Sequence, residues 1–452
     1  MAQLSEAIAR YHELLESPVY QDFSWAVALQ ETMRERRLTQ AGRVVASVLR
    51  PHFLTPRQHE ALARSTERIA AVLFRLEAMV LESPALMSRL QMLPAEKMLA
   101  SIPTGYERLT VSSALDGYQS DTLFGFNSFQ PETPSGTAYL DALSDLFLDL
   151  PVMREFKRGR YKLSKLGNGK QLPAALLRTW KEFGGKTPPQ AIVLEFKAPF
   201  SEDSNEGALF AEIMTAAGIP TRLVAPDQLE YKDGVLRTGE YRIDLVFRRL
   251  AAQDLLLRYD LSHPLLAAYR DRAICMVNSF RAELGRRRAL FALLTDEQIT
   301  GNWPAADRRL IAHHVPWTRL MLHQRTRYHD EIVDLPKFVS ANRERLVLAP
   351  NEVHTQQATF YGREMNQPAW DRAINSALRS PYVVQEAVLA VKRPFPVFQY
   401  GEVQVRELNV VFHPHILLDR MQGVGATLSQ SANGAVVPTS YAPVFLLEDN
   451  QI

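Results

Sequence analysis

The chain has 452 residues, and its 52 Lys and Arg side chains nearly balance its 50 Asp and Glu side chains. At about 150 residues per domain, this length predicts about three domains. The near-neutral charge argues against a dedicated nucleic-acid binder, which usually carries a strong basic excess. The lone cysteine, Cys275, excludes a disulfide framework and fits a reducing compartment. Because the sequence shows neither a secretory signal nor a run of membrane-spanning length, we expect a cytoplasmic protein with no nucleic acid or membrane among its partners.

Residues 1–100 predict a helical region. Thr55-Pro56 is typical of an N-cap followed by proline at the first helical position. Beyond it, apolar residues recur at three- and four-residue spacing and form one helix face: Ile69, Val72, Leu73, Leu76, Met79 and Val80. Two more helices are predicted over residues 4–15 and 23–38. We interpret the apolar face as core and expect no chemistry in this region.

Residues 101–150 change to short strands. Strands are predicted over residues 109–112 and 122–126, on either side of the turn signal Asp116-Gly117. A helix over residues 137–148 follows. It carries three acids four residues apart on one face, namely Asp141, Asp145 and Asp149. Such a stripe could bind a metal ion, but we interpret it as a solvated face.

Residues 170–260 alternate between strands and helices, and the helices and the strand predicted next reach residue 294. Strands are predicted over residues 191–196, 221–225, 241–249 and 273–277, and a helix over 206–217 ends before Gly218. Lys232-Asp233-Gly234 indicates a hairpin turn. Helices are predicted over residues 264–272 and 286–294. This pattern predicts β-α-β architecture. Further on, strands are predicted over residues 345–348 and 382–389, a helix over 369–378, and mostly strands from residue 395.

Three short motifs could carry chemistry. Gly184-Gly185-Lys186-Thr187 resembles the end of a phosphate-binding loop, but Trp180 replaces the required first glycine, so we interpret it as a helix end. His413 and His415 would point to one side of a strand, but no cysteine or carboxylate set completes a metal site, so we expect structural or surface histidines. Residues 286–288 are three arginines, which could hold a phosphate-bearing ligand, although charge alone favours a solvated helix face.

Several separated stretches together resemble the circularly permuted ATP-grasp family, whose best-known relative is glutathionylspermidine synthase. They are Asp116-Gly117-Tyr118 with Phe126-Asn127, and residues 241–249, 273–280, 336–339, 346–351 and 382–386. Their order and spacing match over roughly residues 105–447. The resemblance implies a mixed α/β (α+β) permuted ATP-grasp-like fold after the helical region of residues 1–100. Residues 101–185 would form the first part of the core, 186–280 a Rossmann-like pre-ATP-grasp domain, and 281–452 the ATP-grasp-like domain with its adenine-linker strand.

The resemblance also implies an activity and a site. Such enzymes are ATP-dependent ligases that activate a carboxylate as an acyl phosphate, which an amine then attacks. Matching positions place Mg²⁺ at Asp116 and Asn127, and ATP at Asn351, Gln385 and Glu386. The implied partners are a small-molecule acid and amine, or an active ATP-grasp relative.

The family pattern is broken at charged positions. The metal region usually reads Arg-x-Asp and then Glu-x-Asn, but here Ala114 and Gly125 replace the arginine and the glutamate. Ala349 stands where the family has an ATP lysine, and Thr427 where it has an arginine before Leu-Ser. The usual Gly-Gly-Lys-Gly loop is replaced by a glycine-free segment, residues 354–358. Losing one charge-stabilising donor typically costs about 3–4 kcal/mol, or roughly 10²–10³ in rate.

Three hypotheses follow. The leading one is an ATP-grasp-like protein with a degenerate nucleotide and metal site and a non-catalytic or regulatory binding role. The second is an active Mg²⁺- and ATP-dependent carboxylate–amine ligase whose site is rearranged around a relocated cation: Arg288, Lys337, Arg343 or Arg345. The third is a plain protein-interaction module that contacts its partner through the N-terminal helices.

Overall fold

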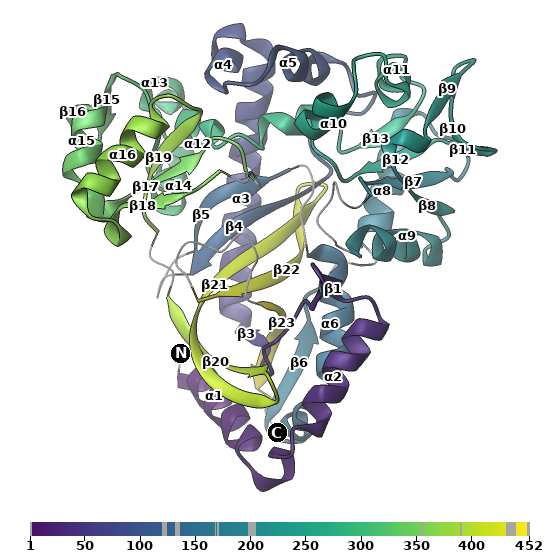
Figure 1. Cartoon of the computed structure of the whole chain (residues 1–452), viewed down its shortest axis with the longest axis vertical. Helices are drawn as coiled ribbons and strands as arrows, with labels where there is room; N and C mark the ends of the chain where they lie inside the picture. The colour runs from purple at the N-terminus through teal and green to yellow at the C-terminus, as the bar shows by residue number, and fades with distance from the viewer. Residues whose placement is uncertain are drawn as a thin grey trace.

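The computed structural model describes residues 2–119, 124–131, 136–167, 169, 171–197, 205–353, 355, 357–388, 391–430 and 440–449. The chain has the mixed α/β fold class that the sequence predicts. A long helix, α3, runs behind a central sheet, and a lobe lies on each side of that sheet (Figure 1). Among the described residues, every helix is too short or too polar to cross a lipid bilayer.

The N-terminal region contains the expected helices together with three short strands. The helices are α1 (Ala2–Leu15), α2 (Ser24–Glu35), α3 (Pro56–Glu82), α4 (Pro84–Arg89) and α5 (Pro94–Ser101). The strands are β1 (Thr39–Gln40), β2 (Arg43–Val44) and β3 (His52–Leu54). Thr55 and Gln58 form a capping box at the start of α3, so two of the unpaired amides at that helix end are satisfied. The predicted apolar face of α3 is buried, as at Ile69 and Leu73.

The central sheet has the strand order β3-β23-β22-β21-β4-β5, with β20 on β21 and β6 on β23. Its other strands are β4 (Ser112–Gln119), β5 (Phe124–Gln130), β6 (Tyr161–Lys165), β20 (Lys392–Gln399), β21 (Glu402–Leu417), β22 (Arg420–Ser429) and β23 (Ser440–Asp449). Leu115, Phe412 and Ala426 share one hydrophobic cluster with α3. Helix α6 (Thr137–Asp149) lies against the other face, where Leu140 reaches Gly425. α7 (Pro151–Arg158) follows it.

The turn predicted at Asp116-Gly117 is wrong. Strand β4 continues through both residues, and the β4–β5 pairing shifts register between them. A β-bulge accommodates the extra residue on the partner strand and re-aims nearby side chains. The glycine that indicated a turn thus marks a bulge within a strand.

A parallel sheet with the order β13-β12-β7-β8 forms the lobe of residues 171–277 (Figure 1). Its strands are β7 (Ala191–Leu194), β8 (Thr221–Val224), β12 (Leu245–Arg248) and β13 (Cys275–Val277). The neighbouring helices are α8 (Gln171–Phe183), α9 (Glu206–Ala216), α10 (Ala252–Arg258) and α11 (Pro264–Arg270). α8 ends before Gly184, which confirms the helix end predicted there.

The predicted hairpin around Asp233-Gly234 joins β9 (Glu230–Lys232) to β10 (Val235–Thr238), and β11 (Tyr241–Ile243) extends it to three strands. Asp233 and Gly234 both have positive φ, the backbone that a tight hairpin requires. The single strand predicted over residues 241–249 is wrong. It divides at Asp244, because β11 belongs to the hairpin sheet and β12 to the parallel sheet.

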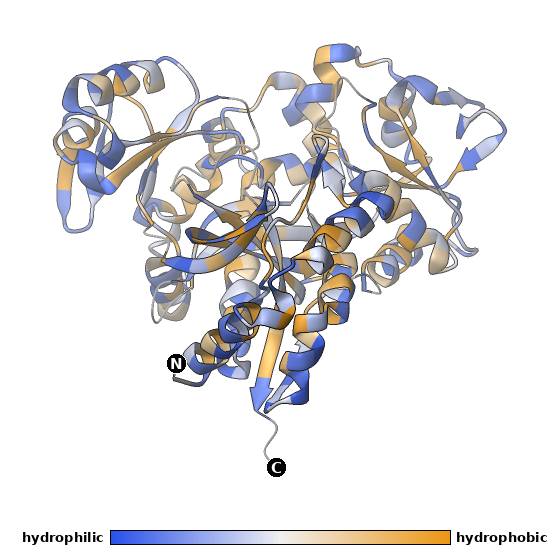
Figure 2. Ribbon diagram, turned by 60° about the horizontal axis from the view of Figure 1, so that its bottom comes forward, coloured by the Kyte–Doolittle hydropathy of each residue, from blue (hydrophilic) through white to orange (hydrophobic). Residues whose placement is uncertain are grey.

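The lobe of residues 289–386 contains a sheet with the order β14-β19-β17-β18 (Figure 1). Its strands are β14 (Thr318–Leu320), β17 (Leu346–Pro350), β18 (Phe360–Tyr361) and β19 (Tyr382–Glu386), and a hairpin is formed by β15 (Arg325–Tyr328) and β16 (Glu331–Asp334). The helices are α12 (Ala289–Leu294), α13 (Glu297–Thr300), α14 (Ala305–His314), α15 (Leu335–Ala341) and α16 (Gln367–Ala377). In Figure 2 the hydrophobic colour of this lobe lies mainly on its strands, and the hydrophilic colour mainly on its outer helices and turns.

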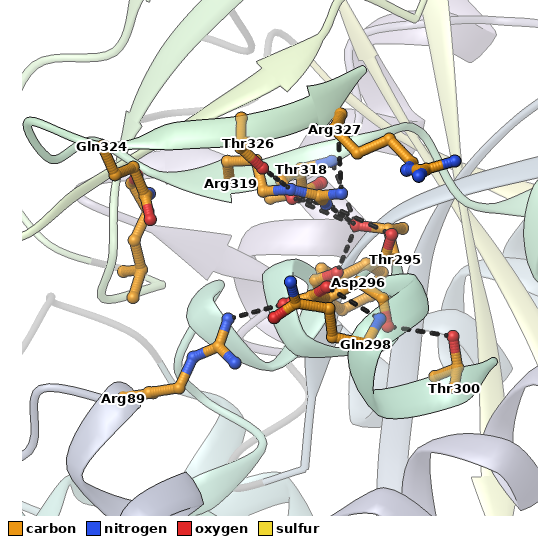
Figure 3. A network of polar contacts seen from close by, with 12 residues as sticks. Arg89, Thr295, Asp296, Gln298, Thr300, Thr318, Arg319, Gln324, Thr326 and Arg327 are labelled. Carbon is orange, nitrogen blue, oxygen red and sulfur yellow. Dashed lines mark hydrogen bonds and ion pairs between the residues drawn. The ribbon is translucent and has the colours of Figure 1, made fainter. Parts of the chain in front are cut away.

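Arg319 on β14 connects several elements of this lobe through hydrogen bonds. Its guanidinium donates to Thr326 Oγ1 at 2.8 Å and to the carbonyl oxygens of Thr318 and Arg327 at 2.7 and 3.2 Å. It also reaches Thr295, while Arg89 pairs with Asp296 at 2.8 Å (Figure 3). Because all three nitrogens of the fork are used, Arg319 joins β14 to the β15–β16 hairpin and to the end of α12.

Candidate functional site

A row of polar side chains crosses four adjacent strands of the central sheet. The carboxylate of Asp116 on β4 accepts hydrogen bonds from Ser128 Oγ and, at 2.6 Å, from Gln130 Nε2, both on β5. His413 Nδ1 on β21 lies 2.8 Å from Asp116 Oδ1, and His413 Nε2 lies 2.8 Å from Thr427 Oγ1 on β22. The five side chains therefore form one connected network on a single face of the sheet.

The charge state of Asp116 follows from its surroundings. Burial raises the pKa of this carboxyl, but hydrogen bonds from His413, Ser128 and Gln130, together with the charge of His413, outweigh burial and hold the pKa well below its ordinary value. Asp116 is therefore ionised and can only accept hydrogen bonds. His413 Nδ1 therefore donates to Asp116, and in the tautomer that carries its proton on Nδ1 the Nε2 atom can accept the hydroxyl proton of Thr427.

A second group lies beside this row, next to the lobe of residues 289–386. Asn127 Nδ2 is 3.5 Å from Tyr118 Oη, and Asn127 Oδ1 is buried without a hydrogen-bond partner in the described structure. Burial lowers the pKa of Arg288, while the charges of Asp116, Tyr361 and Tyr118 raise it. The Arg288 guanidinium also donates to the carbonyl oxygens of Pro350 and Glu352 at 2.7 and 3.1 Å. It was one of four cations considered from the sequence, and the structure brings it close to Asp116.

The adenine-linker positions on β19 are paired with protein groups. Gln385 Nε2 donates to Thr318 Oγ1 at 2.9 Å and to the carbonyl oxygen of Asn127 at 3.3 Å. The structure therefore brings Gln385 and Asn127 together. Glu386 Oε1 accepts a hydrogen bond from Tyr328 Oη at 2.6 Å. The Glu386 side chain is thus engaged within its own lobe, whereas Gln385 links that lobe to β5.

Asn351 and the arginine run connect elements of the fold. The Asn351 side chain accepts from the backbone amide of Ala289 at 2.8 Å and donates to Leu90 O at 2.9 Å, and the residue is 1% exposed. Arg286 and Arg287 pair with Glu352, and Arg287 also pairs with buried Glu96 at 2.5 Å. The expected solvated helix face is therefore wrong. These arginines precede α12, which begins at Ala289, three residues later than predicted.

These contacts test whether Mg²⁺ fits the predicted ligands. Mg²⁺ requires several oxygen ligands in near-octahedral geometry. Three protein donors already occupy lone pairs of Asp116, out of about four that a carboxylate offers. In the described part of the chain, no group of three or more His, Cys, Asp and Glu side chains could hold a metal ion. The residues present therefore do not fit Mg²⁺ at Asp116 and Asn127.

The substituted family positions are mostly buried. Ala114 and Ala349 are 1% and 5% exposed. Thr427 belongs to the polar row and is half-buried. Positions 354 and 356 of the glycine-free segment lie outside the described residues. The acids of α6 face surface cations, since Asp145 pairs with Lys165 at 2.6 Å and Asp149 with Arg154 at 3.3 Å. The interpretation of this helix face as solvated is thereby confirmed for Asp145 and Asp149.

A second polar cluster lies at the carboxyl ends of β7 and β12, which the sequence did not indicate. Arg249 pairs with Glu206 at 2.8 Å and lies 3.5 Å from Glu195. Arg249 Nη1 and Glu195 Oε2 are buried without a hydrogen-bond partner in the described structure. β7 lies between β8 and β12, so the chain order reverses here, which is where open parallel sheets bind ligands. The only sequence signal was the predicted β-α-β order.

Comparisons with known proteins support the fold. No protein-family profile matches the sequence, and no curated protein is significantly similar to it. Among solved structures, the chain is similar to a glutathione synthetase-like effector from Globodera pallida, with 11% identity, a TM-score of 0.59, and coverage of 93% of this chain and 96% of that one. A protein described as a gamma-glutamylcysteine synthetase from Methylobacillus flagellatus KT gives 11% identity, 86% and 87% coverage, and a TM-score of 0.42. The first likeness shows a shared, ATP-grasp-like fold.

Proposed function

We propose that the chain is an ATP-grasp-like protein that has lost Mg²⁺-dependent ligation and serves in binding. The observation that carries this proposal is the engaged carboxylate of Asp116, whose oxygens are hydrogen-bonded to Ser128, Gln130 and His413. The sequence adds support, because Ala114, Gly125 and Ala349 carry no charge where the resembled ligases have charged side chains. Without these groups, the charge on a transferring phosphoryl group has little to balance it.

Calorimetry with ATP, with and without Mg²⁺, tests the proposal on the full chain. We expect no Mg²⁺-dependent increase in affinity, and no ATP hydrolysis coupled to amide formation across a panel of acids and amines. Coupled hydrolysis and amide formation by the purified chain would overturn the proposal. Weak, Mg²⁺-independent binding of ATP that Arg288→Met removes agrees with it, because Arg288 supplies positive charge near Asp116, Tyr118 and Tyr361.

The alternative is an active ligase with a rearranged site. The Oδ1 of Asn127, which is buried without a hydrogen-bond partner in the described structure, favours it, since this atom can accept one further contact. An active ligase requires that Asn127→Ala abolish Mg²⁺-dependent turnover, whereas the binding role requires that the wild-type chain already show none. A single assay of wild type and Asn127→Ala therefore distinguishes the two functions.

The Arg249 cluster defines the ligand class of the binding role. Arg249 Nη1 has no hydrogen bond in the described structure, and Glu195 Oε2 is held by an ion pair with Arg249 Nε at 3.5 Å without a hydrogen bond. These two atoms suit the carboxylate and the amine of a small molecule. We expect amino acids or short peptides to raise the melting temperature of the wild type but not of Arg249→Met. Equal shifts in both proteins count against this assignment. If the chain instead regulates an active ATP-grasp relative, we expect the chain and that relative to co-purify.

A further inference from the structure

Three side chains of the polar row have the spacing of a nucleophile, a base and a group that orients the base. Asp116 Oδ1 lies 2.8 Å from His413 Nδ1, and His413 Nε2 lies 2.8 Å from Thr427 Oγ1. A hydroxyl within hydrogen-bond reach of an imidazole, which a carboxylate orients through its other nitrogen, is the arrangement that activates a weak nucleophile. Such sets are identified by geometry and not by fold or chain order.

Strand pairing fixes this arrangement. β21 pairs with β4 so that Phe412 lies opposite Gly117, which places His413 beside Asp116. β21 pairs with β22 so that His413 lies opposite Gly425, and Thr427, two residues further along β22, points to the same face. Three adjacent strands thus carry one member each, and no loop movement is needed to bring them together.

Hydrogen bonds also fix the orientation of each group. Ser128 and Gln130 occupy further lone pairs of Asp116, which prevents the carboxylate from turning away from His413. The ionised carboxylate selects the His413 tautomer with its proton on Nδ1, so Nε2 is ready to accept the Thr427 hydroxyl proton. His413 is 16% and Asp116 15% exposed at the side chain, and Thr427 is half-buried, so the row is not sealed from solvent.

We propose that Asp116, His413 and Thr427 form a hydrolytic triad that cleaves small esters or thioesters through an acyl-Thr427 intermediate. This activity goes beyond the binding role and needs no nucleotide. Thr427 and His413 are the catalytic residues, and Asp116 is a positioning residue that acts through His413.

The steps balance with water as the co-reactant. His413 Nε2 takes the Thr427 hydroxyl proton while Oγ1 forms a bond to the substrate carbonyl carbon. The tetrahedral intermediate collapses, the bond to the alcohol or thiol breaks, and His413 returns the proton to that leaving group. Water then loses a proton to His413 and attacks the acyl carbon. The carboxylic acid leaves, and Thr427 Oγ1 recovers its proton from His413.

His415 provides a contrast within the same strand. Its ring lies on the same face and reaches Thr137 Oγ1 only at 3.3 Å, and the residue is 2% exposed. Burial lowers the pKa of His415, the neighbouring His413 lowers it further, and Asp116 opposes both effects only weakly, so that the pKa is about 3. The second histidine is therefore a buried neutral group, and only His413 has both a carboxylate and a hydroxyl in contact.

The experiment uses the full chain without nucleotide. p-Nitrophenyl acetate reports hydrolysis, and an acylating β-lactone followed by peptide mass spectrometry locates the modified side chain. We expect the adduct on Thr427, a loss of about 10²-fold or more in turnover for Thr427→Val, and retained turnover for Thr427→Ser. Thr238→Val, at a half-buried strand threonine of the β9–β10 hairpin, is the matched control and leaves turnover unchanged.

The positioning role of Asp116 has its own readout. Asp116→Asn should lower kcat by up to about 10⁴-fold while KM stays within a few-fold, because the amide favours the wrong His413 tautomer. Adducts found only on other side chains, or unchanged turnover in folded Thr427→Val, would overturn the proposal. Adduct mapping on the wild type needs no variant, so the test remains decisive if Thr427→Val does not fold.

Discussion

His413 Nδ1 lies 2.8 Å from Asp116 Oδ1, although 297 residues separate the two in sequence. The contact joins β21 to β4 in the middle of the central sheet, so it contributes to stability as well as to the site. Asp116→Ala leaves Ser128, Gln130 and His413 without their shared acceptor. We expect the free energy of unfolding to fall by about 3 kcal/mol, as urea titration would measure. Asp330→Ala, at an exposed hairpin residue, should change it by less than about 0.5 kcal/mol. Equal effects would contradict this role.

Glu77 on α3 should make stability fall as the pH rises. The residue is 0% exposed, neither carboxyl oxygen has a partner in the described structure, and burial raises its pKa well above the ordinary 4.5. The folded protein therefore keeps a proton that the unfolded chain releases above pH 4.5. The contribution of this proton to the free energy of unfolding is complete below that pH. It is lost as the pH rises through the pKa that Glu77 has in the folded protein.

Glu77→Met tests this directly, because it removes the carboxyl and keeps the side-chain volume. We expect unfolding at pH 8 to cost about 1–3 kcal/mol more than in the wild type, with a smaller difference at pH 5. Exposed Glu82 at the end of the same helix provides the control Glu82→Gln. A wild type and a Glu77→Met variant with parallel pH profiles would rule out Glu77 as the source.

Arg319→Lys should loosen the β15–β16 hairpin. The guanidinium of Arg319 makes hydrogen bonds with all three of its nitrogens, to Thr326, Thr295, Thr318 and Arg327 (Figure 3). An ammonium cannot reproduce that planar fork. We expect a loss of about 2 kcal/mol in stability, with faster amide exchange in residues 325–334 than elsewhere. Uniform acceleration across the chain would show that Arg319 does not act locally.

Removing one partner of a buried ion pair before α12 should lower the free energy of unfolding strongly. Arg287 and Glu96 are 6% and 0% exposed at the side chain. Arg287→Met leaves Glu96 buried without its cation, and we expect it to cost about 3–5 kcal/mol in thermal or urea unfolding. Arg10→Ala breaks a surface pair with Glu13 and should cost less than about 1 kcal/mol. If Arg287→Met left the free energy of unfolding unchanged, Glu96 would have to pair with another group or take up a proton.

Local sequence signals predicted most elements but not their long-range pairing. Capping and periodicity located α3 because Thr55, Gln58 and the apolar face act within one helix. The strand over residues 241–249 was predicted as one, since propensity cannot show that its halves join different sheets. At Asp116-Gly117, local turn preference was overridden by pairing with β5 and β21.

The site was predictable only in part, for the same reason. Asp116, Asn127 and Gln385 were predicted from the resemblance. In the structure Gln385 donates to the carbonyl oxygen of Asn127, and Asp116 belongs to the neighbouring polar row. His413 was considered a structural histidine, because nothing near it in sequence is a carboxylate. Its partners Asp116 and Thr427 lie 297 and 14 residues away. Arg286 and Arg287 looked solvated because their partners, Glu96 and Glu352, lie far along the chain.

Because α3 packs on strands from the end of the sequence, it is synthesised long before part of its packing surface. The helix ends at Glu82, but it packs on β21, β22 and β23, and the last of these begins at Ser440. At ~5–20 residues per second, a ribosome needs roughly 20–70 s to make the chain between them. During that interval the part of the α3 apolar face that packs on β21, β22 and β23 lacks its cover, although α4, α12 and α14 already contact the helix. Early chaperone contact should therefore centre on residues 56–82.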